Sequence, residues 1–142
     1  MEPTTRKILD YVRAQVLLET GLRVDQVHFL TSIDAALEDL PDLVLFSLVD
    51  KPVREEGTDS DGGQDHQFSF AVSISVASED ERATDTLACQ VRKSVLQDVT
   101  LGRLAFGTVW DVQEWGSGTG SSPTAMTKLT FTATYNWSPE WL

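Results

Sequence analysis

The stretch QFSFAVSISVAS, residues 67–78, decides the fold of this chain. Apolar and small polar side chains alternate along it, which is the period of an extended chain and not that of a helix. One side carries Phe68, Phe70, Val72, Ile74 and Val76, and the other carries Gln67, Ser69, Ala71, Ser73 and Ser75. The stretch therefore predicts a β-strand with one strongly apolar face.

A second pair of strands is predicted nearer the C-terminus. TAMTKLTFTATYNWS, residues 124–138, has the same period of two, and RLAFGTVWDVQEW, residues 103–115, is rich in β-branched and aromatic residues. Between them lies WGSGTGSSP, residues 115–123, whose alternating glycines are also typical of phosphate-binding loops. Such a loop needs a following helix and a lysine that reaches the phosphates, and this sequence has neither. The glycines therefore predict the loop of a long hairpin.

Two segments have the period of amphipathic helices. The first covers residues 4–20 and has Gly21 as its C-cap. Its apolar residues form two stripes, Ile8, Val12 and Val16 on one and Tyr11, Ala14 and Leu18 on the other. Two stripes predict burial against more than one element. The second helix is expected over about residues 79–99, with Leu87, Ala88, Val91 and Val95 on its inner side.

The segments between these elements are shorter. VDQVHFL, residues 24–30, is a weak strand candidate, and SIDAALEDLP, residues 32–41, predicts a short helix that ends before Pro41. DLVLFSLVD, residues 42–50, predicts an apolar strand. KPVREEGTDSDGGQDH, residues 51–66, is charged and almost free of apolar residues, so it predicts a flexible loop.

This order predicts an α+β (α/β) fold. We expect a mixed, mainly antiparallel sheet of about four or five strands, built from two long hairpins with helices packed on it. The length of 142 residues fits a single domain over residues 1–142. Flexible loops are expected at about residues 50–66 and 116–123.

The composition limits the function classes. The formal net charge is −11 and the sequence pI is about 4.4, which argues against binding to nucleic-acid phosphates. The single cysteine, Cys89, excludes an intrachain disulfide. The first residues have no signal-peptide core, and no apolar run approaches the roughly 18 residues of a membrane helix. We therefore expect a cytoplasmic protein without a membrane partner.

The sequence offers no convincing catalytic or metal site. If an EF-hand began at Asp59, its sixth position would be Gln64 and its twelfth Phe70, whereas the motif needs glycine and glutamate there. Cys89 would need a histidine to act as a nucleophile, and neither His28 nor His66 is placed to suggest one. We predict that the chain is not an enzyme and binds no cofactor.

The four tryptophans allow two interpretations. Trp110 and Trp115 lie on one predicted strand, and Trp137 and Trp141 lie near the C-terminus. Aromatic residues bury large areas in any core, so packing explains them. Tryptophan is also enriched at the energetic centres of interfaces, and Trp141 and Leu142 after Pro139 favour docking on a partner.

The order of elements resembles a known family. DAALEDLPDLVLFSLVD, residues 34–50, the polar loop after it, FSFAVSISVASEDERATDTLACQVRKSVLQD, residues 68–98, and two closing strands are similar to the tail terminator proteins of long-tailed bacteriophages, the minor tail protein U group. The resemblance implies a homo-hexameric ring that stops polymerisation of the tail tube and forms the head-joining surface. It implies a virion protein, assembled in the host cytoplasm, whose partners are the major tail tube protein and a neck or head-completion protein, while DNA passes without specific binding.

Two groups of residues are expected to serve this role. Subunit contacts are assigned to Cys89, Leu96, Trp110, Trp137, Trp141 and Leu142. An acidic loop facing the lumen or the tube end is assigned to Glu55, Glu56, Asp59, Asp61 and Asp65. The alternatives are a neck or head-completion protein, and a small-molecule-binding regulatory α+β domain, since this kind of fold hosts many functions.

Overall fold

A computed structural model describes residues 3–29, 41–53, 64–118 and 123–137. These residues form a mixed five-stranded sheet in the order β1-β2-β3-β5-β4. The strands are β1 (Val27–Phe29), β2 (Asp42–Pro52), β3 (Gln64–Val76), β4 (Gly107–Gly118) and β5 (Thr124–Trp137). The α-helices are α1 (Thr4–Thr20) and α2 (Asp85–Leu96), and each is accompanied by a short 3₁₀ helix, η1 (Val24–Gln26) and η3 (Glu81–Thr84). None of these helices is long and apolar enough to cross a membrane.

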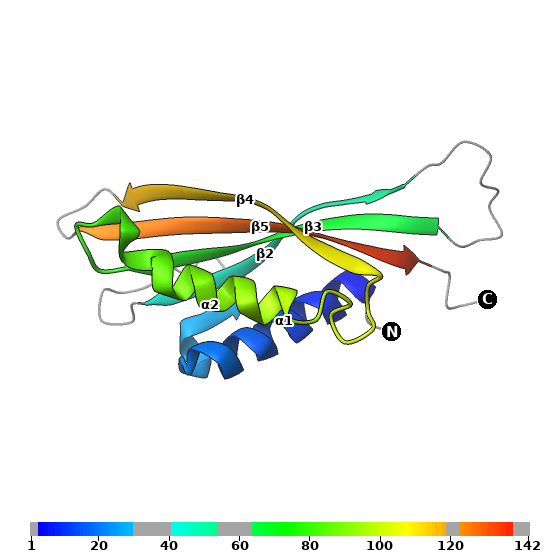
Figure 1. Cartoon of the computed structure of the whole chain (residues 1–142), viewed down its shortest axis with the longest axis horizontal. Helices are drawn as coiled ribbons and strands as arrows, with labels where there is room; N and C mark the ends of the chain where they lie inside the picture. Colours follow the sequence, from blue (N-terminus) through cyan, green and yellow to red (C-terminus); the bar gives the residue numbers. More distant parts are fainter. Residues whose placement is uncertain (1–2, 30–40, 54–63, 119–122, 138–142) are drawn as a thin grey trace.

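Two long antiparallel hairpins make up most of the sheet. One joins β2 to β3, the other joins β4 to β5, and the β3–β5 pair holds them together at the centre. Only β1 runs parallel to its neighbour, β2. The expected fold class is therefore confirmed. Figure 1 shows both α-helices on one side of an elongated, twisted sheet.

The core lies between the sheet and the helices. Phe70 of β3 stacks on Phe131 of β5, with ring centroids 5.6 Å apart, because the register places the two residues directly opposite each other. The other core residues of these strands are Phe68, Val72, Ile74, Leu129, Ala133 and Tyr135. The helices contribute Ile8, Leu9, Val12, Val16, Ala88, Val91 and Val95. The predicted alternation is thus confirmed over residues 67–76 and 124–136.

Helix α1 buries one stripe, and the second predicted stripe is wrong. Ala14 is exposed and Leu18 is 79% exposed, while Tyr11 is half-buried. In a two-layer fold the sheet and α2 cover only the inner side of α1, so the outer side stays in water.

The second helix is shorter than expected. It ends at Leu96, and residues 97–104 form a tight turn. The Asp98 carboxylate accepts hydrogen bonds from Thr100 N, Thr100 Oγ1 and Gly102 N. Three successive residues, Leu101, Gly102 and Arg103, have φ values of 49°, 68° and 70°. The left-handed backbone at these three residues interrupts any extended segment, so the next strand begins at Gly107 rather than at Arg103.

Strand pairing extends into both segments that were expected to be loops. Asp50 to Pro52 pair with Phe68 to His66, and Gly116 to Gly118 pair with Met126 to Thr124. The expected short helix at residues 32–41 falls almost entirely outside the described residues.

Candidate functional site

The exposed apolar side chains of the described residues gather at one edge of the sheet. Strand β4 is the last strand on this side. It carries, with the residue just before it, half of the large exposed apolar side chains: Phe106, Val109, Trp110, Val112 and Trp115. We call these five residues the β4 rim. Clusters of this kind on a soluble domain mark interaction surfaces.

A β-bulge brings the two tryptophans of the rim to the same face. Trp110 and Trp115 are five positions apart, so a regular strand would point them to opposite faces. The register shifts between Trp110 and Val112, which leaves Asp111 as the extra residue. Trp110 then lies opposite Phe131 and Trp115 opposite Thr127, two positions on the core-facing side of β5. Both tryptophans therefore face the side of the sheet that carries α2.

Arg92 of α2 contacts both Trp110 and Cys89, two exposed residues that were assigned to subunit contacts. Its guanidinium carbon lies 4.5 Å from the centre of the Trp110 ring. Its Nη2 is 3.0 Å from the Cys89 Sγ, which accepts a hydrogen bond from it. Trp110 is 40% exposed and Cys89 is an exposed free thiol. The three side chains form one mixed aromatic and cationic surface.

A second pair of the same type lies further along β4. The guanidinium carbon of Arg82 lies 4.8 Å from the centre of the Trp115 ring, and Trp115 Nε1 donates to Asp85 Oδ1 over 3.1 Å. Arg82 also contacts the other carboxylate oxygen of Asp85 at 3.4 Å. Cation–π pairs at exposed sites contribute about 0.5–1 kcal/mol each, so the two arginines help to hold these rings in place. Both rings stay partly exposed. Tryptophan and arginine are the residue types most often found at the energetic centres of interfaces.

Asp50 of β2, His66 of β3 and Tyr135 of β5 form a polar cluster near the C-terminal end of β2. The Tyr135 hydroxyl donates to both oxygens of Asp50, at 3.0 and 2.8 Å, and His66 Nδ1 lies 3.2 Å from Asp50 Oδ1. The His66 and Tyr135 rings are 5.4 Å apart. Burial, and then the hydrogen bond to Asp50, raise the pKa of Tyr135 above its ordinary value. The cluster fastens the end of β2 to β3 and β5.

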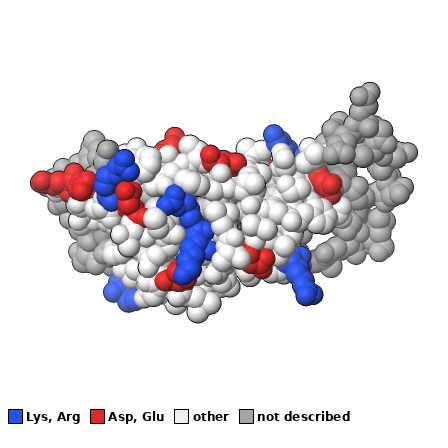
Figure 2. Space-filling model, viewed as in Figure 1, with Lys and Arg blue, Asp and Glu red and all other residues white. Residues whose placement is uncertain are grey.

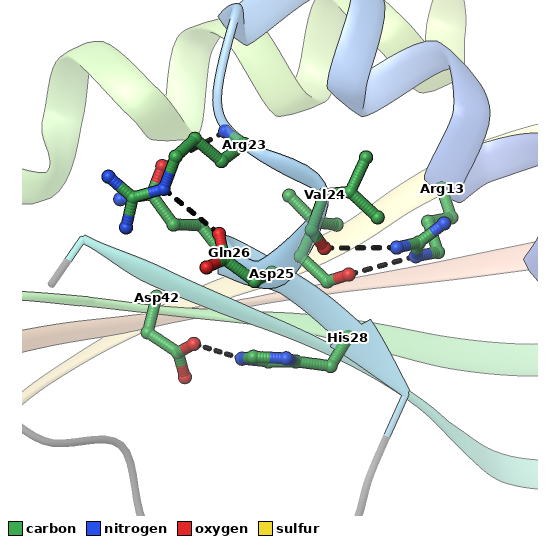
Figure 3. A network of polar contacts seen from close by, with 8 residues as sticks. Arg13, Arg23, Val24, Asp25, Gln26, His28 and Asp42 are labelled. Carbon is green, nitrogen blue, oxygen red and sulfur yellow. Dashed lines mark hydrogen bonds and ion pairs between the residues drawn. The ribbon is translucent and has the colours of Figure 1, made fainter. Parts of the chain in front are cut away.

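The short strand β1 is held by polar contacts with its neighbours (Figure 3). Arg13 of α1 donates to the carbonyl of Val27 at 2.8 Å and to the carbonyl of Val24 at 3.0 Å. His28 of β1 contacts the carboxylate of Asp42 at the start of β2. Both histidines therefore have carboxylate partners, which the sequence did not indicate.

The residues assigned to subunit contacts are not all equivalent. Cys89 and Trp110 are exposed and lie together, whereas Leu96 is half-buried against the core. Trp137 is the last residue of β5. Trp141 and Leu142 lie outside the described residues.

Of the acidic loop, only Asp65 is described. It is exposed, but it belongs to β3 and accepts a hydrogen bond from Asn136 Nδ2 at 3.3 Å, so its placement in a loop was wrong. Glu55, Glu56, Asp59 and Asp61 lie outside the described residues.

Charged side chains of both signs are interspersed over the face seen in Figure 2. The described residues contain no group of three or more histidine, cysteine, aspartate or glutamate side chains placed to hold a metal ion.

Comparison with known proteins gives a likeness of fold. No protein-family model and no curated protein matches the chain. One similar chain belongs to a solved structure titled "Virion of native gene transfer agent (GTA) particle". The match has a TM-score of 0.58 at 13% sequence identity, and it covers 89% of this chain and 92% of the other. At this identity the match shows that the two chains share a fold over nearly their whole lengths.

Proposed function

We propose that this protein is a structural component of a phage-like virion. The observation that carries the proposal is the match to a chain from a gene transfer agent virion, because it spans about nine tenths of both chains. The exposed β4 rim supports it, since a virion component needs surfaces that bind other subunits.

Within that class we propose the tail terminator role. A homo-hexameric ring would cap the tail tube at the head-proximal end, stop its polymerisation and present a surface to a neck or head-completion protein. The support is the resemblance of element order to tail terminators, together with the two-hairpin sheet and the helices on one side of it. The acidic composition suits a channel through which DNA passes, because acidic side chains repel phosphates.

The proposed subunit contacts centre on Cys89 and Trp110, which lie together at the β4 rim. Leu96, Trp137, Trp141 and Leu142 remain in the proposal from their sequence positions. The acidic group, Glu55, Glu56, Asp59, Asp61 and Asp65, is proposed to face the lumen or the tube end.

The first test is the mass of the purified protein by light scattering over a series of protein and salt concentrations. We expect a hexamer, or a monomer that moves toward a hexamer as salt screens the like charges. Trp110→Ala should weaken this association, while Leu18→Ala, which truncates an exposed apolar residue on the outer side of α1, should not. Leu96→Asp is a poorer probe because it would also place a charge against the core.

The second test locates the protein in particles. An antibody against the chain should label purified particles at the junction of head and tail. Labelling spread over the capsid would reject the terminator role but keep the structural one, and particles that lack the chain altogether would reject both.

A further inference from the structure

Two of the strand edges that pair with no other strand among the residues described lie on opposite sides of the sheet. One is the outer edge of β4, the last strand of the sheet. The other is the second half of β2, because β1 pairs only with Leu43 to Leu45 and leaves residues 46–52 of β2 without a partner on that side. Residues 47–52 are also exposed.

The two edges carry apolar side chains at the same positions along the sheet. Strand pairing places Val49, Ser69, Thr132 and Val109 in one row across the sheet, and Phe46, Ala71, Thr130 and Val112 in the next. Each row therefore begins on β2 and ends on β4 with an apolar side chain on the face opposite the helices. Val49 is 52% exposed and Val109 is 58% exposed.

The strand directions are also compatible. From β2 through β3 and β5 to β4 every neighbouring pair is antiparallel, so β4 runs opposite to β2. A second copy placed beside β4 in the same orientation would present its own β2, antiparallel to β4, with the same rows facing each other. Val109 would then lie beside Val49 of the next copy, and Val112 beside Phe46. Apolar and β-branched pairs of this kind stabilise antiparallel strands.

We propose that copies of this chain join head to tail by pairing the β4 edge, residues 107–112, with the β2 edge, residues 46–52, of the next copy. This names the subunit contact of the proposed ring and rests on that proposed function. A contact between two different patches closes into a ring when the rotation per subunit allows it.

Charge favours a second copy at this place. The chain has a formal net charge of −11, so copies repel each other over most contacts. The two edge segments carry only Asp50, Lys51 and Asp111, and Asp50 is already bonded to Tyr135. The same rows would place exposed Lys51 beside Gly107 of the next copy and exposed Asp111 near Phe46, so neither charge would meet a like charge. The edges therefore let a second copy approach with little charge repulsion across the contact.

The area explains why a dimer alone would be weak. A six-residue edge is about 20 Å long, and a sheet is about 10 Å thick, so each partner would contribute roughly 200 Å². A stable complex buries about 800 Å² on each partner. Each copy makes two such contacts in a closed ring and only one at the end of an open chain, so association should appear at high concentration and favour the closed form.

Cross-linking tests the proposal directly. Cys89→Ser removes the native thiol, and Val49→Cys with Val109→Cys then places one thiol on each edge. Oxidation of the concentrated double variant should give a ladder of covalent species that ends at the ring size. Each single cysteine variant should give no dimer. The control pair, Leu18→Cys with Val109→Cys, has at least as much exposure but places one thiol on α1, and it should give no ladder.

The outcomes separate the proposal from the proposed function. A ring seen by light scattering without a ladder would overturn the strand pairing and leave the ring intact. Dimers of the single Val109→Cys variant would overturn it in favour of β4 pairing with another β4. Monomers with no ladder at the highest concentration would reject both the pairing and self-assembly.

Discussion

Removal of one buried hydroxyl should loosen the end of β2, the segment that we propose as a docking edge. The change is Tyr135→Phe. Tyr135 is almost fully buried, and its hydroxyl donates to both carboxylate oxygens of Asp50 at 3.0 and 2.8 Å. The substitution keeps the ring in the core and removes only this link.

The size of the effect follows from the chemistry of the bond. A hydrogen bond to a charged group contributes about 1.5–3 kcal/mol. The Asp50 side chain is 38% exposed, so water replaces part of the lost contact and the lower end of the range applies. We expect the free energy of unfolding to fall by about 1.5 kcal/mol and the melting temperature to fall by about 5 °C.

The pH dependence gives a second signature. Burial and Asp50 raise the pKa of Tyr135 in the folded state above the ordinary value near 10. Above that pH the unfolded chain releases the proton while the folded chain keeps it, so stability is full below the ordinary pKa and is lost as the pH rises. Tyr135→Phe should make this loss less steep. Tyr11→Phe should act in the same direction, because burial and Asp98 also raise the pKa of Tyr11.

Urea unfolding of the wild type, Tyr135→Phe, Asp50→Asn and the double variant measures the coupling at neutral pH. If the hydroxyl stabilises the fold through Asp50, the double variant should lose less than the sum of the single losses. Strictly additive losses, or a wild-type midpoint for Tyr135→Phe, would refute the reasoning.

Three further predictions concern other parts of the fold. Gly102→Ala should lower the free energy of unfolding by at least about 1–2 kcal/mol, because the residue has φ +68° and a Cβ there would lie 2.9 Å from Tyr11 Cε2; an unchanged urea midpoint would contradict this. Phe70→Ala removes a fully buried ring stacked on Phe131 and should cost about 3–5 kcal/mol in the same assay, and a loss below 1 kcal/mol would mean a looser core than the structure shows. Cys89 should react fully with Ellman's reagent in the dilute native protein and be protected at concentrations where oligomers form; equal rates at all concentrations would place it outside the subunit contact.

Much of the sheet could be predicted from the sequence because its strands alternate clearly. Residues 67–76 and 124–136 bury one face each, so their apolar period reflects a real boundary between core and surface. The glycine-rich segment 115–123 predicted a hairpin, and β4 and β5 do pair around it. The order of strands was not predictable, because β3 and β5 pair across about sixty residues of chain and no local pattern specifies that choice.

The candidate site was only partly predictable for a physical reason. Cys89 and Trp110 were selected by residue type, and the structure places both on the surface. Their contact through Arg92 depends on how α2 packs beside β4, which no local pattern specifies. The bulge at Asp111 changes the face of every later residue on β4, including Trp115, and has no recognisable sequence signal. Leu96 was assigned to subunit contacts on a helix expected to reach residue 99, but α2 ends at Leu96 itself and the side chain packs partly on the core.

The place of β5 within the sheet also affects how the chain is made. It is the last of the five strands to leave the ribosome, yet it lies between β3 and β4 and pairs with both. Until it is synthesised, β3 lacks one neighbour and β4 lacks the strand that it pairs with, so nascent chains expose unpaired strand edges that tend to aggregate. Folding of this sheet should therefore be late and cooperative, and chains stalled before β5 should depend on chaperones to remain in solution.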